Sequence, residues 1–64
     1  MNWQFSPFRV VAWRGRKRVD RVFVLEGDAR CFADRMRGEG CGLVEVWEWD
    51  GSWWNDLDYY EARV

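Results

Sequence analysis

The chain has no histidine, only two cysteines and a single proline in its 64 residues. Without histidine, Cys31 and Cys41 cannot complete a usual four-ligand zinc site, and two cysteines are too few for a disulfide scaffold. A cysteine nucleophile would also lack the imidazole that normally activates it. The sequence therefore predicts a protein with no metal site and no cofactor.

Long apolar runs are missing as well. No stretch is long enough to cross a membrane, and residues 1–7 lack the basic region and the apolar region of a secretory signal. The glycine-rich residues 38–42 precede an expected strand, whereas a phosphate-binding loop needs a helix after it. We therefore expect a cytoplasmic protein that contacts no membrane and is not an enzyme.

Aromatic residues are abundant, with six Trp, four Phe and two Tyr. A chain of this length buries only about 60% of the surface that its unfolded form exposes. Large aromatic side chains supply much apolar area per residue, so they help a short chain to fold without disulfides or metals. We expect one domain spanning residues 1–64.

Hydrophobic periodicity predicts four strands and one helix. The strands are expected at residues 8–13, 19–25, 43–49 and 52–60, and the helix at residues 29–37. Residues 22–25 are apolar on both faces, which favours an interior position for the second strand. The predicted fold is α+β, an antiparallel sheet in ββαββ order with one helix packed on one face.

The expected helix has recognisable ends and one apolar stripe. Asp28 suits the N-cap, and Gly38 and Gly40 suit the C-terminal end. The stripe has helical spacing and consists of Ala29, Phe32, Ala33 and Met36. Cys31 lies opposite that stripe and is expected to be exposed, while Cys41 is expected to be a small buried residue.

The dipeptide Asp50-Gly51 is a strong signal for a hairpin turn. In a two-residue turn, Trp47 pairs with Trp54. One face of the hairpin then carries three apolar side chains: Val44, Val46 and Leu57. The opposite face carries an aromatic patch with an acidic fringe: Trp47, Trp49, Trp54, Glu45 and Asp56. If the helix covers the valine face, this patch is a contact surface.

A three-residue loop gives a different outcome. Trp49 would then pair with Trp53, and Trp47, Trp49 and Leu57 would turn into the core. One step of register exchanges the two faces of a strand. Because a small domain is short of apolar mass, both alternatives stay open from the sequence.

The net charge is only −1, but the charges are unevenly distributed along the chain. Residues 1–21 sum to +5 and residues 43–64 to −5. The cations cluster at the first expected hairpin: Arg14, Arg16, Lys17, Arg18 and Arg21. Such a cluster either follows a phosphate backbone or is a solvated hairpin end.

The acids of the second half follow the second expected hairpin: Glu45, Glu48, Asp50, Asp56, Asp58 and Glu61. They either face a basic groove of a partner or keep a half-exposed hairpin soluble and free of edge pairing. The candidate partner-binding residues combine the tryptophans with both groups of charge: Trp47, Trp49, Trp54, Glu45, Glu48, Asp56, Arg14, Arg16, Lys17 and Arg18.

The element order, the short length and the split charge resemble small inhibitors of host machinery encoded by phages or mobile elements. These include some anti-CRISPR proteins and short phage inhibitors of RNA polymerase. The resemblance implies a stoichiometric inhibitor that occludes a host protein or ribonucleoprotein complex, acting in the host cytoplasm if the protein is phage-encoded. Trp47, Trp54, Arg16 and Arg18 are the expected main contacts.

Two other functions fit the same sequence. The first is direct binding of nucleic acid through the arginine-rich hairpin, with Arg16 and Arg18 on the phosphates. The second is a self-associating structural subunit, such as a homodimer, with a sheet edge or the tryptophan face at its interface.

Overall fold

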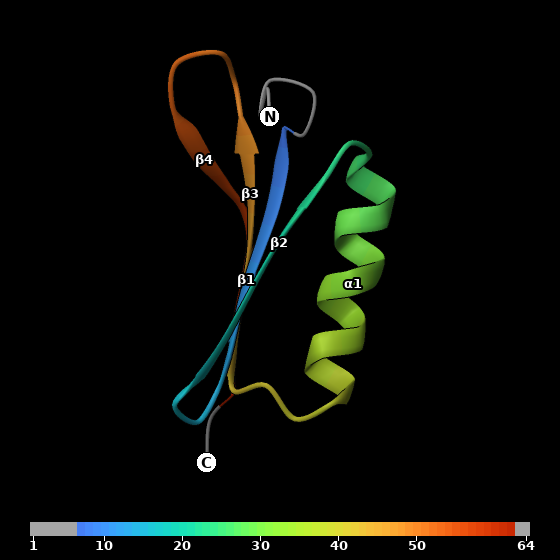
Figure 1. Cartoon of the computed structure of the whole chain (residues 1–64), viewed down its shortest axis with the longest axis vertical. Coiled ribbons are helices and arrows are strands. Elements are labelled where there is room, and N and C mark those ends of the chain that lie inside the picture. Colours follow the sequence, from blue (N-terminus) through green and yellow to red (C-terminus); the bar gives the residue numbers. More distant parts are fainter. Residues whose placement is uncertain (1–6, 63–64) are drawn as a thin grey trace.

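The computed structural model describes residues 7–62 and confirms an α+β fold with one antiparallel sheet and one helix. Its elements follow in chain order: β1 (Phe8–Arg14), β2 (Lys17–Phe23), α1 (Glu26–Gly38), β3 (Leu43–Trp49) and β4 (Trp54–Glu61). The strand order across the sheet is β2-β1-β3-β4, and α1 lies along one side of the sheet (Figure 1). In the described part of the chain, no helix is long and apolar enough to cross a membrane.

Strand β2 lies at an edge of the sheet, so the prediction of an interior position was wrong. Central β1 pairs with β2 on one side and with β3 on the other. The apolar run at residues 22–25 does not belong to one strand: Phe23 packs against the core, Val22 points to the other face, and Val24 and Leu25 are exposed in the connection to α1. The four apolar residues therefore belong to two structural elements, the end of β2 and the connection to α1, and do not indicate a strand that is buried on both faces.

Helix α1 begins at Glu26, three residues before the expected start. The carbonyl of Leu25 accepts the first helical hydrogen bond from the amide of Ala29, at 3.2 Å, and Leu25 is the N-cap residue. No side chain caps this end, so the predicted N-cap role of Asp28 was wrong. Asp28 lies with Glu26 in the first turn, where a negative charge interacts favourably with the helix dipole.

The C-terminal end of α1 is closed at Gly40 as predicted, whereas Gly38 is the last residue of the helix and not a left-handed one. The amide of Cys41 donates to the carbonyl of Met36 at 3.0 Å, and the amide of Gly40 donates to the carbonyl of Arg37 at 3.1 Å. Gly40 has φ +94°, the left-handed conformation that a Schellman end requires. These bonds pair carbonyls of the last helical turn and bring Cys41 under the helix.

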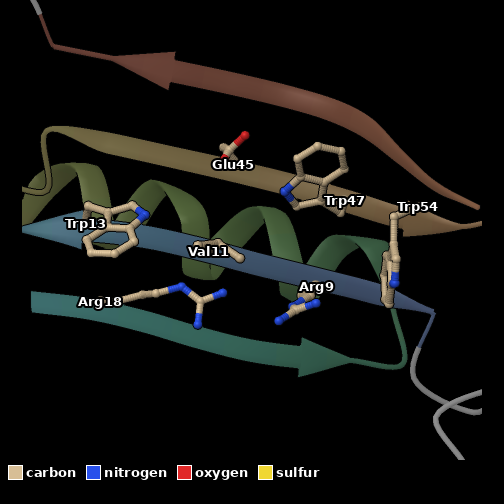
Figure 2. Close-up of a pocket in the computed structure, with 7 residues that line it drawn as sticks. All are labelled: Arg9, Val11, Trp13, Arg18, Glu45, Trp47 and Trp54. Carbon is tan, nitrogen blue, oxygen red and sulfur yellow. The ribbon is translucent and has the colours of Figure 1, made fainter.

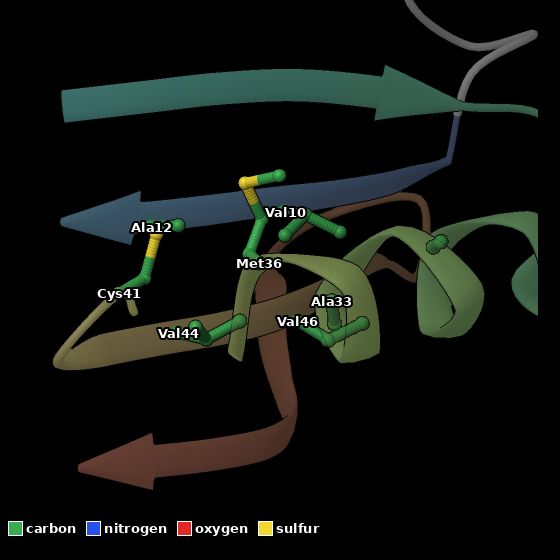
Figure 3. Packing of buried hydrophobic residues seen from close by; sticks show 8 residues of the cluster. Val10, Ala12, Ala33, Met36, Cys41, Val44 and Val46 are labelled. Carbon is green, nitrogen blue, oxygen red and sulfur yellow. The ribbon is translucent and has the colours of Figure 1, made fainter. Parts of the chain in front are cut away.

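The core lies between α1 and the two central strands and is made of small side chains (Figure 3). Its buried members come from β1, β3, α1 and the connection after α1: Val10, Ala12, Val44, Val46, Ala29, Ala33, Met36 and Cys41. The predicted stripe of α1 faces this core, with Phe32 partly buried at its margin. Cys41 is buried and Cys31 exposed, as expected. None of the described tryptophans is buried.

The β3–β4 hairpin follows neither of the two expected registers. Trp49 pairs with Trp54, so the connection is a loop of residues 50–53. The Asp50 carboxylate organises the loop: Oδ1 accepts from the amides of Ser52 and Trp53, and Oδ2 accepts from Nδ2 of Asn55, each at 2.8 Å. Gly51 has φ +105°. The amide of Asp50 also donates to the carbonyl of Trp53 at 3.1 Å, so the side chain and the backbone of Asp50 close the loop together.

A β-bulge in β4 shifts the alternation of its side chains by one residue. Val46 pairs with Asp58 and Trp47 with Asp56, which leaves Leu57 between two pairs, where it packs against the core. The pairings of the two-residue alternative were wrong, but its two faces were right. Val44 and Val46 lie under α1, and the tryptophans of β3 lie on the other side.

Candidate functional site

The candidate site is the face of the sheet that α1 leaves uncovered, which we call the open face. Val10, Val44 and Val46 point toward α1, so their strand neighbours point away from it. The register places these side chains on the open face: Arg9, Val11 and Trp13 of β1; Arg18, Asp20 and Val22 of β2; Leu43, Glu45, Trp47 and Trp49 of β3; Trp54, Asp56, Tyr59 and Glu61 of β4.

A hollow of about 420 Å³ lies over the middle of the open face (Figure 2). Its floor is Val11, which is only 7% exposed although no helix covers it. Its remaining lining consists of aromatic and charged side chains: Trp13, Trp47, Trp54, Arg9, Arg18 and Glu45. This volume is within the range of ligand-binding pockets.

A second hollow, of about 430 Å³, lies toward the edge strand β2. Arg9 and Trp54 line both hollows, and Asp20, Val22 and Trp49 complete the second. Together the two hollows extend across the four strands, and every described tryptophan except Trp53 lines one of them. The open face is therefore one continuous aromatic surface with two depressions.

The aromatic side chains of the open face are held by specific contacts. Trp49 and Trp54 meet edge to face, with ring centroids 5.4 Å apart and an interplanar angle of 61°. The guanidinium carbon of Arg9 lies 5.8 Å from the centre of the Trp54 ring. That of Arg18 lies 6.0 Å from the centre of the Trp13 ring. Contacts of both kinds are worth about 0.5–1 kcal/mol each at exposed positions, so they orient the rings before any partner arrives.

The charges on the β1–β2 half of the open face are matched to one another. Nε of Arg9 donates to Oδ1 of Asp20 at 2.8 Å, and a second nitrogen of Arg9 contacts the other carboxylate oxygen. Arg18 approaches the same carboxylate at 3.1 Å. The hydrogen bonds from Arg9 lower the pKa of Asp20, and Asp20 in turn raises the pKa of Arg9. Two arginines thus share one aspartate.

The charges on the β3–β4 half are all negative. Glu45, Asp56 and Glu61 have no cation within salt-bridge distance among residues 7–62. The hydroxyl of Tyr59 donates to Glu61 at 3.1 Å. That hydrogen bond raises the pKa of Tyr59, and the negative charges of Glu61, Glu45 and Asp56 raise it further. The three carboxylates therefore surround Tyr59 as one acidic cluster.

Most of the sequence-predicted site residues meet on the open face. Trp47, Trp49, Trp54, Glu45, Asp56 and Arg18 are all there. Glu48 belongs to β3 but pairs with Phe8, so it points to the side that α1 covers. Gly15 and Arg16 form the two-residue turn of the β1–β2 hairpin. Arg14 and Lys17 pair with each other next to this turn, and their side chains point to the same side of the sheet as Phe8. The cationic cluster is therefore divided between the face and the hairpin tip.

Several residues of this surface were absent from the predicted contact residues, and two of them, Arg9 and Trp13, line the central hollow. Both alternate with Val10 and Ala12 in β1, so the strand carries a period-2 pattern that separates a core face from an outer face. That alternation was hidden because Val11, on the outer face, is as apolar as its neighbours. Arg9 is the link between the two hollows, so it is the most informative of the missed positions.

The open face has to be interpreted from its own residues. A scan against protein-family models, a search of the curated proteins and a search of the solved structures found no match to this chain.

Proposed function

We propose that this protein is a non-enzymatic binding module, a stoichiometric inhibitor whose open face occludes a nucleic-acid-handling protein complex of a host cell. The observation that carries the proposal is the position of four tryptophans, Trp13, Trp47, Trp49 and Trp54, on a face that no element of residues 7–62 covers. The core beneath them is complete without a single tryptophan.

Tryptophans in this position are suited to supply affinity. Trp and Arg are the residues most enriched among those that dominate binding energy at protein interfaces, especially around central depressions. Here Trp47 and Trp54 flank a hollow whose floor is the nearly buried Val11. Because Arg9 and Arg18 already hold two of the rings in place, little side-chain entropy remains to be lost on binding.

The nature of the target follows from the resemblance to small phage inhibitors and from the charge of the chain. Proteins that handle nucleic acids expose basic grooves for phosphates. A compact protein with an acidic cluster beside aromatic anchors fits such a groove and blocks it sterically. This mechanism requires no catalysis and one copy of the inhibitor per target.

The proposal is tested by capture of target complexes from a host-cell lysate, with identification of the bound proteins by mass spectrometry. Trp47→Ala is expected to abolish capture. The variant should still fold and should unfold cooperatively on heating, as followed by near-ultraviolet circular dichroism. Trp53→Ala is the matched control, because Trp53 is 74% exposed but lines neither hollow, and it is expected to retain capture. Equal capture by the wild type and the Trp47→Ala variant would rule the proposal out.

A second function, direct nucleic-acid binding, is favoured by the hairpin tip. Arg14, Arg16 and Lys17 have no carboxylate partner among the described residues. This function predicts salt-sensitive binding of a single-stranded DNA oligonucleotide that Arg16→Glu eliminates. A flat titration at low salt would exclude it and leave the inhibitor proposal intact.

A further inference from the structure

We infer that the occupant of the open face is a cationic protein surface, whose arginine or lysine side chains dock on the β3–β4 half at Glu45, Asp56 and Glu61. This inference rests on the proposed function and adds to it the chemistry of the partner and the half of the face that contacts it. The two halves of the open face differ in how their charges are paired, and that difference decides which half contacts the partner.

The β1–β2 half offers little charge to a partner. Arg9 and Arg18 both contact Asp20, and both lie over tryptophan rings of the same face. An acidic partner would have to compete with the Asp20 carboxylate for Arg9, whose bidentate geometry is the strongest that an arginine forms with a carboxylate. This half is therefore a preorganised wall of the hollow.

The β3–β4 half offers three carboxylates that make no ion pair in the described part of the chain. Glu45 also lines the central hollow, next to the ring of Trp47 (Figure 2). An arginine from a partner that enters the hollow meets an aromatic face and a carboxylate together. Its planar guanidinium stacks on aromatic rings and donates paired hydrogen bonds to a carboxylate, so this combination suits arginine. The raised pKa of Tyr59 is consistent with the negative potential there.

Other occupants of this half fit less well. A nucleic-acid backbone would bring phosphates against three carboxylates, and like charges at an interface cost binding energy. A second copy of this chain, turned so that the halves face each other, would set three carboxylates against two arginines that already share an aspartate. A cationic protein surface is the occupant that balances the cluster.

The probe that tests this inference is a synthetic peptide of alternating arginine and serine, with a peptide of alternating glutamate and serine as its control. Binding is followed by tryptophan fluorescence at low and moderate salt. We expect the arginine peptide to bind, the glutamate peptide not to bind, and Glu45→Lys to weaken binding by about tenfold or more. Glu48→Lys makes the same charge change on the same strand but on the opposite face, so we expect it to stay within about twofold of the wild type.

Several outcomes would overturn the inference. One is equal weakening by Glu45→Lys and Glu48→Lys, because it would reduce the effect to net charge. A second is that the arginine peptide does not bind. A third is that a single-stranded oligonucleotide binds more tightly to the wild type than to the Arg9→Ala variant. A dimer in light scattering that Trp47→Ala dissociates would assign the face to a second copy. Asp56→Lys, at an exposed position, repeats the test if Glu45→Lys fails to fold.

The lysate experiment separates failure of the inference from failure of the proposed function. Capture that is lost in Trp47→Ala but retained in both Glu45→Lys and Asp56→Lys would keep the inhibitor proposal and overturn the cationic partner. Capture that survives Trp47→Ala would overturn the proposed function itself. Loss in all three variants, with Glu48→Lys unaffected, supports both.

Discussion

The two faces of the sheet differ in where their large side chains lie. The buried centre under α1 is made of valine, alanine, methionine and cysteine, with Phe8, Phe23 and Tyr60 only partly buried around it, whereas the open face carries Trp13, Trp47, Trp49 and Trp54. Large aromatics are usually counted toward the core of a small protein. Here α1 packs on the central strands through small residues such as Ala29 and Ala33, and none of the described tryptophans belongs to the buried cluster. The core therefore lies on one face of these strands, and the recognition proposed above uses the other face.

The sharpest way to break this comparison is one substitution made on each face. Val46→Asp buries a carboxylate at a position that is 1% exposed, with no partner in the core. A buried unpaired charge costs several kcal/mol, which is comparable to the whole stability of a small domain. We expect no cooperative unfolding transition in circular dichroism. Val22→Asp, on the open face at 43% exposure, is expected to change the free energy of unfolding by about 0.5 kcal/mol or less. Similar losses for both variants would contradict the division of roles.

The ion pairs of the open face are expected to contribute less to the free energy of unfolding than the buried core does. Arg9 lowers the pKa of Asp20 below its ordinary value of 3.8, so the folded state favours the ionised form. Its contribution is fully present above about pH 4 and is lost as pH falls through the lowered pKa. Asp20→Asn is expected to reduce the free energy of unfolding by about 1 kcal/mol or less at pH 7, because the pair is partly exposed.

Urea titrations at neutral and acidic pH measure this effect. The difference between wild type and Asp20→Asn should shrink as the pH falls below 4. Asp56→Asn is the matched control, because Asp56 has no cation partner among residues 7–62, and it should show no such difference. A gap for Asp20→Asn that is the same at both pH values would exclude the Arg9 contact as its cause.

The acidic cluster is expected to show a smaller, spectroscopic effect. Tyr59 has a raised pKa, first because its hydroxyl donates to Glu61 and then because Glu61, Glu45 and Asp56 are negative. In a Tyr60→Phe background, tyrosinate absorbance reports Tyr59 alone. Glu61→Gln is expected to lower the pKa of Tyr59 toward 10, whereas Glu48→Gln, on the opposite face, should leave it unchanged. An unchanged value in Glu61→Gln would show that the contact between Tyr59 and Glu61 does not form in solution.

The smallest perturbation compares the two cysteines. Cys31 is exposed on α1, and Cys41 is buried beneath it. A thiol reagent is expected to modify one cysteine rapidly in the native protein and the second only after denaturation. Cys31→Ser should remove the rapid phase and preserve the slow one. Rapid modification of both residues would mean that the end of α1 opens readily.

Local signals predicted the helix and its C-terminal end because they depend on neighbouring residues. The spacing of Ala29, Phe32, Ala33 and Met36 and the left-handed Gly40 act within a few turns of chain. The start of α1 was misjudged because Asp28 has the right chemistry for a cap, while the backbone of Leu25 was already positioned by the end of β2. The interior position expected for β2 failed for a related reason: its apolar run includes residues that leave the strand.

The candidate site depended more strongly on the fold. The sequence alone predicted a tryptophan-rich hairpin and two alternatives for its faces, since one step of register separates them. The four-residue loop organised by Asp50 and the bulge at Leu57 set the observed alternation, and neither has a clear signature in the sequence. Arg9 and Trp13 joined the site only because β1 lies next to β3.

The amino-acid sequence by itself determined the helix with its apolar stripe and a tryptophan-rich hairpin with two alternating sets of side chains, because hydrophobic periodicity is a local property. It did not determine which of the two sets the helix covers. Only the tertiary structure decided which strands are central and which charges meet. Pairing of Arg9 with Asp20, and the absence of an ion pair at Glu45 within residues 7–62, depend on strand order across the sheet. Strand order is set by the packing of all elements at once, and no short segment encodes it.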